Sequence, residues 1–121
     1  MAATALLLIA HGSRQPEANA DLFHLCDCLR QHGYGVVEAA FLEFVEPTIS
    51  QAGARCVEQK AERVVLVPYF LSAGVHVRRD LSEAQRELSD RFPSVEFRLA
   101  EPVGRHPLMV EVVLDRVKEV T

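Results

Sequence analysis

Four short apolar runs alternate along the chain with four segments whose apolar residues recur at helical spacing. The runs cover residues 4–10, 36–42, 64–69 and 95–99, and each has the length of a β-strand. Glycine or proline lies at several of the junctions, where the chain must turn. Strands that alternate with helices through short connections predict a three-layer α/β/α fold, with a parallel four-stranded sheet and helices on both faces.

Each helical segment shows one apolar face. Pro16 suits the first turn of the first helix, and Pro47 is expected to open the second. The third is expected to begin near residues 76–80, where Asp80 and the glutamate three residues later resemble a capping box, and the fourth covers residues 107–119. The residues expected to be buried in the first three helices are Leu22, Leu25, Cys26 and Leu29, then Ile49, Ala52, Gly53, Cys56 and Val57, then Leu81, Ala84 and Leu88.

The composition of the strands predicts their order in the sheet. LLLIA in the first strand and VVLV in the third are unbroken apolar runs, which is typical of central parallel strands buried on both faces. The second and fourth runs alternate with charged residues and are expected at the edges, so the predicted order is 2-1-3-4. Pro68 is placed at the carboxyl end of the third strand, since proline cannot donate a ladder hydrogen bond. No linker divides the series, so residues 1–121 are expected to form a single domain.

Composition and charge narrow the class of protein. A hydrophobic fraction of 49% and a charged fraction of 25% are those of a folded globular chain. A net charge of −4 argues against nucleic-acid binding. No apolar run reaches the roughly 18–20 residues of a membrane helix, and the N-terminus lacks the basic region of a signal peptide, so we expect a cytoplasmic protein. Cys26, Cys28 and Cys56 form no zinc pattern and are expected to be structural thiols.

Two histidines follow the two central strands. His11 comes directly after the first strand, and His76 comes shortly after the third. In an open α/β sheet, ligands bind beyond the carboxyl ends of the strands where the strand order reverses, and here that point lies between these two strands. Glu43 and Glu46 leave the second strand at the same edge, and Glu46 equally suits a carboxylate at the N-terminus of the next helix.

These side chains suit two kinds of chemistry. Two imidazoles with a carboxylate can bind cobalt, nickel, iron or zinc, or can act as acid–base groups near neutral pH. A single histidine after a strand is commonly an ordinary loop or capping residue. The shared edge is what favours a joint function for His11 and His76.

Four arginines are expected at the same edge. Arg14 follows the first strand, Arg78 and Arg79 the third, and Arg105 the fourth, which predicts a locally positive site for a polyanionic small molecule. The alternative is that they are ordinary solvated residues at helix starts. The sequence has no G-x-x-x-x-G-K-[ST] or G-x-G-x-x-G phosphate loop, and without a G-x-S-x-G motif Ser13 is no candidate nucleophile.

Four stretches resemble the sirohydrochlorin chelatases, class II chelatases that insert cobalt or iron into sirohydrochlorin. In the order and spacing of that family the chain carries LLLIAHGSR, FLEFVEPTI, VVLVPYFLSAGVHVRRDL and VGRHPLMVEVVLDR. The resemblance covers nearly the whole chain and is closest to the short, single-module form. It implies the chelatase version of a flavodoxin-like fold, which agrees with the predicted strand order.

The resemblance also implies roles for individual residues. The two metal-handling histidines of the family match His11 and His76, and its acidic partner matches Glu43, with Glu46 as a nearby competitor. These three, His11, His76 and Glu43, are the expected catalytic and metal-binding residues. The expected substrate-binding residues are Ser13, Arg14, Ser72, Arg78, Arg79 and Arg105. Tyr69 departs from the smaller or aliphatic residue of many relatives, which puts the preferred tetrapyrrole in doubt.

The function implied is that of a cytoplasmic metal chelatase, a lyase of cobalamin or sirohaem biosynthesis that works as a homodimer. The divalent metal is a substrate, with cobalt expected first and iron or nickel as alternatives, and no organic cofactor is implied. In this hypothesis His11 and His76 present the metal and take up protons, and Glu43 assists deprotonation or metal entry.

Two other functions remain open. One is a non-catalytic carrier of metal or tetrapyrrole that uses the same site. The other is phosphoryl transfer with His11 as nucleophile, which is disfavoured because Ala10 stands where histidine phosphatases carry arginine.

Overall fold

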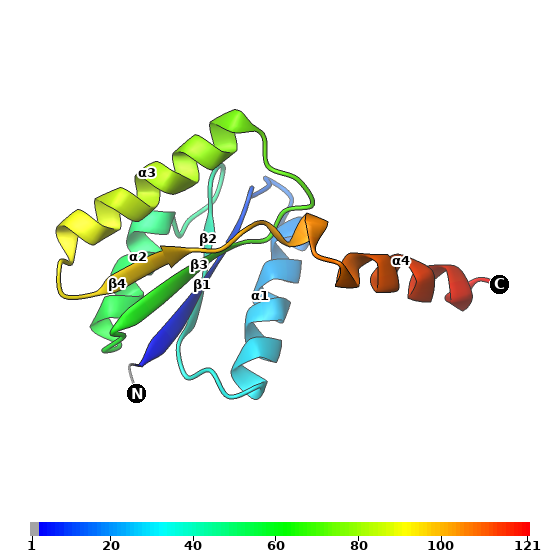
Figure 1. Ribbon diagram of the computed structural model, residues 1–121, viewed down its shortest axis with the longest axis horizontal. Helices are drawn as coiled ribbons and strands as arrows, with labels where there is room; N and C mark the ends of the chain where they lie inside the picture. The colour runs from blue at the N-terminus through cyan, green and yellow to red at the C-terminus, as the bar shows by residue number, and fades with distance from the viewer. Residues whose placement is uncertain (1–2) are drawn as a thin grey trace.

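Strands and helices alternate along the chain as the sequence predicts. The computed structural model describes residues 3–121 (Figure 1). The strands are β1 (Thr4–Ala10), β2 (Val37–Phe41), β3 (Arg63–Pro68) and β4 (Glu96–Leu99). The helices are α1 (Pro16–Gln31), α2 (Ile49–Glu58), α3 (Val75–Arg91) and α4 (Leu108–Glu119), and a 3-10 turn, η1 (Val103–Arg105), precedes α4.

The four strands form one parallel sheet in the order β2-β1-β3-β4, which confirms the predicted order. In the register of the sheet, Leu8 of β1 lies beside Ala39 of β2 and Val67 of β3. Pro68 is the last residue of β3, as expected. The point at which the strand order reverses therefore lies between β1 and β3, and the loops that follow these strands meet at the carboxyl edge of the sheet.

The sheet separates two apolar clusters. One lies between the sheet and α2 with α3, and the other lies between the sheet and α1 (Figure 1). The predicted apolar faces of these three helices are confirmed, since their residues are buried or partly buried in the two clusters. α2 and α3 approach so closely that a Cβ on Gly53 would lie 2.6 Å from Cδ2 of Leu88.

Two of the three cysteines are buried parts of these clusters. Burial raises the pKa of the Cys26 thiol to about 11 and that of the Cys56 thiol to about 12. Both thiols are therefore protonated at neutral pH, which makes them poor metal ligands and poor nucleophiles. Cys28 is half-buried, with its Sγ 3.6 Å from Nε2 of His24.

The third helix begins close to the expected residues 76–80, but two expectations about how the helices start are wrong. α3 begins at Val75 with Gly74 as its N-cap, so Asp80 lies inside the helix and does not cap it. α2 begins two residues after Pro47, because a different capping box fixes its start. Thr48 Oγ1 accepts a hydrogen bond from Gln51 N–H at 3.2 Å, and Gln51 Oε1 accepts one from Thr48 N–H at 2.9 Å.

Helices lie on both faces of the sheet, as predicted, but α4 is not one of them. α4 extends away from the sheet, contacts η1 and has no buried residue (Figure 1). α1 packs mainly on β1 and β2, and Val67 of β3 packs against the same cluster. Among residues 3–121, no residue of β4 belongs to that cluster. The sequence pattern shows that α4 has an apolar face but does not show what that face contacts.

None of the helices in the part of the chain that the structure describes is long and apolar enough to span a membrane.

We expect Leu88→Ala to lower the free energy of unfolding by about 2–5 kcal/mol, because the leucine is fully buried against Gly53 and its loss leaves a cavity. Urea unfolding followed by circular dichroism measures this change. Leu71→Ala is the matched control, since Leu71 is 74% exposed and its truncation should change stability by less than about 0.5 kcal/mol. Equal losses in the two variants would contradict the assigned packing of α3 on α2.

Candidate functional site

The loops after β1 and β2 are held together through their backbones. Gly12 has φ +94°, and a Cβ at this position would lie 2.1 Å from the carbonyl oxygen of Glu43. The Glu43 N–H donates a hydrogen bond to the carbonyl oxygen of His11 at 2.9 Å. Only glycine allows both the positive φ and this approach. The structure therefore places the chain at His11 and at Glu43 side by side at the carboxyl edge, as the sequence predicts.

The imidazole of His11 packs on an aromatic ring from the loop after β3. The ring centroids of His11 and Phe70 lie 4.5 Å apart, and the phenyl ring is buried. The loop is anchored beside β1 because Tyr69 N–H donates to the carbonyl oxygen of Ile9 at 2.7 Å. The side chain of Tyr69 remains 43% exposed. His11 is thus oriented by the residue that begins the connection to α3.

His76 lies in the first turn of α3 and is exposed. It lies at the same carboxyl edge as His11, and the connection from β3 to α3 separates it from the phenyl ring that contacts His11. Within residues 3–121, no three histidine, cysteine, aspartate or glutamate side chains lie close enough to hold a metal ion. The structure does not gather the three expected ligands into one cluster, and the metal-binding role of His11, His76 and Glu43 stays a prediction.

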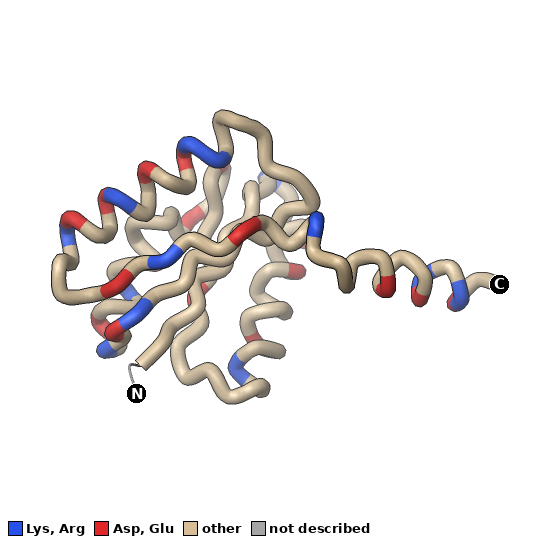
Figure 2. The backbone as a smooth tube through the Cα atoms, viewed as in Figure 1, with Lys and Arg blue, Asp and Glu red and all other residues tan. Residues whose placement is uncertain are grey.

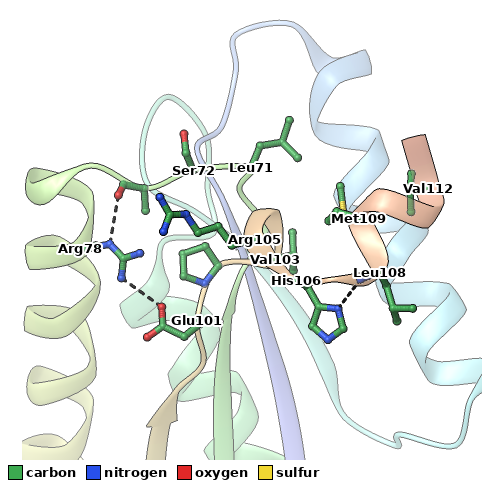
Figure 3. A pocket seen from close by; sticks show the side chains of 12 residues that line it. Leu71, Ser72, Arg78, Glu101, Val103, Arg105, His106, Leu108, Met109 and Val112 are labelled. Carbon is green, nitrogen blue, oxygen red and sulfur yellow. Dashed lines mark hydrogen bonds and ion pairs between the residues drawn. The ribbon is translucent and has the colours of Figure 1, made fainter. Parts of the chain in front are cut away.

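A pocket of about 1020 Å³ lies beside this edge (Figure 3). It is formed by the loop after β3, by the segment from β4 through η1 and by the start of α4. Three of the expected substrate-binding residues, Ser72, Arg78 and Arg105, line it, whereas Ser13, Arg14 and Arg79 do not. The complete lining is Leu71, Ser72, Ala73, Arg78, Glu101, Pro102, Val103, Arg105, His106, Leu108, Met109 and Val112.

The two arginines of the pocket are positioned differently. Arg78 Nε donates to the carbonyl oxygen of Ala73 at 3.2 Å, and its Nη1 lies 3.3 Å from Oε2 of Glu101 (Figure 3). Arg105 belongs to η1, whose Gly104 N–H donates to the carbonyl oxygen of Phe70 at 3.1 Å. A Cβ on Gly104 would lie 1.6 Å from the next carbonyl oxygen along that loop. The glycine therefore allows η1 to lie against the loop after β3 and brings Arg105 to the pocket.

Two polar residues, Glu101 and His106, and one wall of the pocket were not predicted from the sequence. His106 lines the pocket, and its Nδ1 accepts a hydrogen bond from Leu108 N–H at 3.1 Å (Figure 3). The first turns of α4 supply an apolar wall through Leu108, Met109 and Val112. His106 could have been predicted as a pocket residue, because it directly follows Arg105 at the same edge of the sheet. The apolar residues of α4 gave none, because the same pattern is typical of a core helix.

Two of the predicted residues after β1 lie in a tight turn. Ser13 Oγ accepts a hydrogen bond from Gln15 N–H at 3.0 Å, and Ser13 N–H donates to Oδ1 of the buried Asn19 at 2.9 Å. These bonds shape the entry to α1. The guanidinium carbon of Arg14 lies 4.7 Å above the ring centroid of Phe44. Substrate binding by Ser13 and Arg14 stays a prediction.

The remaining two candidates lie apart from the pocket lining. Glu46 Oε2 accepts a hydrogen bond from Nε2 of Gln51 in the first turn of α2, which matches its alternative role as a carboxylate at a helix N-terminus. Arg79 is exposed on α3. Figure 2 shows basic and acidic residues alternating along the outer side of α3.

The chain is similar to known proteins of one family over nearly its whole length. The model of the CbiX family matches residues 5–120. The chain is 34% identical over 117 residues to the chloroplastic sirohydrochlorin ferrochelatase of Arabidopsis thaliana, covering 96% of this chain and 52% of that protein. The chain therefore spans about half the length of this relative.

Two solved structures are similar over nearly the whole chain. A putative cobalamin biosynthesis CbiX protein from Marinobacter aquaeolei VT8 is 30% identical with a TM-score of 0.84, covering 96% of this chain and 95% of the other. The sirohydrochlorin chelatase SirB from Bacillus subtilis subspecies spizizenii, in complex with cobalt, is 30% identical with a TM-score of 0.85, covering 97% of this chain and 50% of the other. The chain belongs to the CbiX family.

Proposed function

We propose that this protein is a cytoplasmic sirohydrochlorin chelatase that inserts a divalent metal ion into the tetrapyrrole. The observation that carries the proposal is the pocket of about 1020 Å³ at the carboxyl edge, bordered by Arg78 and Arg105 and beginning one residue after the phenyl ring that contacts His11. Its volume is at the upper end of the range of small-molecule pockets, which suits a large ligand such as a tetrapyrrole. Family membership supports the same activity.

The metal is a substrate of this reaction, and we propose cobalt, with iron or nickel as alternatives. Both metals occur among the similar proteins: the Arabidopsis protein is named a ferrochelatase, and the SirB structure contains cobalt. Imidazole and carboxylate ligands accept several first-row divalent ions, so the side chains alone do not select one. Because the side chains do not select the metal, the proposed reaction fits both cobalamin and sirohaem synthesis. No organic cofactor is part of the proposal.

The reaction requires the loss of two pyrrole N–H protons and the release of water from the metal. We assign presentation of the metal and uptake of protons to His11 and His76, since neutral imidazole serves both purposes. Glu43, whose backbone is bonded to that of His11, assists deprotonation or metal entry. Arg78, Arg105 and Ser72 contact the carboxylates of the substrate from the pocket, and Ser13, Arg14 and Arg79 do so from its surroundings.

We also propose that the protein is a homodimer. The main support is an exposed apolar surface on α4. Val110, Val113, Leu114 and Val117 form one stripe at helical spacing, and all four are exposed. A continuous apolar stripe on an exposed helix is typical of a contact with another protein. Because the first turn of α4 lines the pocket, a partner on α4 would lie next to the site.

A second copy offers a matching surface. On β3, Val64 and Leu66 belong to the cluster under α2 and α3, so Val65 and Val67 face the opposite side. Both valines are only partly buried there, and Val67 packs against the cluster under α1. Beside them lies the exposed charge cluster Arg63, Glu96 and Arg98, in which hydrogen bonds from Arg63 and then Arg98 lower the pKa of Glu96.

Charged residues border the apolar part of both surfaces. The cluster of Arg63, Glu96 and Arg98 carries one net positive charge. The polar side of α4 includes Glu111 and Asp115, and charges of both signs follow the helix in Figure 2. We therefore propose that α4 of each copy packs on β3 and β4 of the other.

We expect His76→Ala to lower the rate of Co²⁺ insertion into sirohydrochlorin by about 10²-fold or more, the scale on which a positioned proton acceptor contributes. The absorption spectrum of sirohydrochlorin measures insertion, and thermal unfolding checks that the fold is kept. His32→Ala is the matched control, because His32 lies at the C-terminal end of α1 on the opposite edge of the sheet. Insertion at the wild-type rate by the His76 variant would contradict the role assigned to it. A wild-type protein that binds both substrates without accelerating insertion would be a carrier instead.

We expect the double variant Val113→Asp, Val117→Asp to convert the dimer into a monomer of 13.5 kDa, because two carboxylates on the apolar stripe oppose its burial. Size-exclusion chromatography with light scattering at several protein concentrations measures the mass. Lys118→Gln on the polar side of α4 should leave the dimer intact. A wild-type protein that is monomeric at all concentrations refutes the dimer.

A further inference from the structure

Phe44 occupies an unusual turn between Glu43 and Val45. Val45 N–H donates a hydrogen bond to the carbonyl oxygen of Glu43 at 2.8 Å, and Phe44 between them has φ +71°. A bond from residue i+2 to residue i with a positive φ at the centre is the rare and strained form of the γ-turn. Residues other than glycine avoid this region because Cβ approaches the backbone. Such an outlier is informative when the surroundings hold it in place.

The surroundings do hold this turn in place. The Glu43 N–H is bonded to the carbonyl oxygen of His11, and the carbonyl oxygen of Glu43 lies against Gly12. At the other end, Phe41 N–H donates to the carbonyl oxygen of Pro47 at 2.9 Å. The backbone on both sides of Phe44 is therefore fixed, on one side by the contacts that also place His11.

The ring of Phe44 gains little from its own chain. It is 59% exposed, although burying a phenyl ring is strongly favourable. The guanidinium of Arg14 lies over one face of the ring, 4.7 Å from its centroid, and Arg14 takes part in no ion pair among residues 3–121. Arg14 covers one face of this exposed ring. The other face is open and lies beside the carboxyl edge of the sheet, near His11 and Glu43.

We propose that Phe44 is a substrate-contacting residue: the open face of its ring packs on the flat, conjugated macrocycle of the tetrapyrrole. Its other face positions Arg14, so that the guanidinium meets a carboxylate at the periphery of the same molecule. This inference rests on the proposed function for the class of substrate. In this proposal Phe44 recognises the ring system of the substrate, whereas the arginines of the pocket bind only its carboxylates.

The experiment compares three variants at this position in the full chain. Phe44→Leu removes the aromatic face, Phe44→Tyr keeps it, and Phe44→Gly removes the ring while relaxing the positive φ. We expect Phe44→Leu and Phe44→Gly to raise the Kd for metal-free sirohydrochlorin, measured by its fluorescence, about 3–10-fold, the scale of one aromatic stacking contact. Phe44→Tyr should remain within about twofold of the wild type. In metal insertion, KM should rise with Kd while kcat changes little, since the ring binds substrate before and during the reaction alike.

The Tm of Phe44→Gly separates binding from folding. Because glycine relieves the turn, its Tm should equal or exceed that of Phe44→Leu, so weaker binding by this variant cannot come from a damaged fold. Tyr34→Leu is the matched control, since Tyr34 is also an exposed aromatic residue but lies between α1 and β2 at the opposite edge. Its Kd should equal that of the wild type.

The role of Phe44 in positioning Arg14 is tested by a double-mutant cycle. Arg14→Gln should weaken binding in the wild-type background and have a smaller effect in Phe44→Leu, because the guanidinium is no longer held there. Strictly additive effects would overturn this part of the proposal. Unchanged Kd values for Phe44→Leu and Phe44→Gly would overturn the stacking contact. A change in dimer mass without a change in Kd would instead assign the ring to the subunit interface.

The outcomes also distinguish this inference from the proposed function. If the wild-type protein binds sirohydrochlorin without accelerating metal insertion and the Phe44 variants bind it more weakly, the chelatase activity fails and the ring contact stands. If insertion proceeds normally in Phe44→Gly with unchanged KM, the ring contact fails and the chelatase activity stands.

Discussion

The contact between the backbone at Gly12 and the carbonyl of Glu43 is the constraint on which the site depends. It closes the gap between the loops after β1 and β2, which lie at neighbouring positions in the sheet. A side chain at position 12 would force these loops apart and separate His11 from Glu43. The strained turn at Phe44 follows from the same constraint, because Glu43 is bonded on one side to His11 and on the other to Val45.

A second glycine has a comparable function on the other side of the site. Gly104 allows η1 to lie against the loop after β3, and this approach turns a strand end, a connecting loop and the start of α4 into the walls of one pocket. The loop after β3 connects the two sides of the site, since it carries both the phenyl ring that contacts His11 and the carbonyl oxygen beside Gly104. The site therefore consists of loops fixed by backbone approach on a rigid parallel sheet.

Much of this fold can be predicted from the sequence because the information is local. Unbroken apolar runs identify β1 and β3 as central strands, and helical spacing identifies the buried faces of three helices. The sequence also places His11, Glu43 and the arginines at one edge, because parallel strands end at the same side of a sheet.

Other features depend on contacts that periodicity does not record. The start of α3 depends on Gly74, the pocket depends on how closely η1 approaches the loop after β3, and the apolar pattern of α4 is the same whether the helix is buried or exposed. Whether the three expected metal ligands form a cluster is likewise not recorded in the sequence pattern. A common edge of the sheet brings residues into one region, but the orientation of each side chain decides whether they meet.

The exposed position of α4 has a consequence for how this part of the chain folds. A segment of 12 residues is short for a helix that must persist in water without tertiary contacts. If its apolar stripe is covered by another copy, the ordering of the last tenth of the chain becomes a second-order process. Helix content in the C-terminal region would then rise with protein concentration, while the sheet and the other three helices would fold at a rate independent of it.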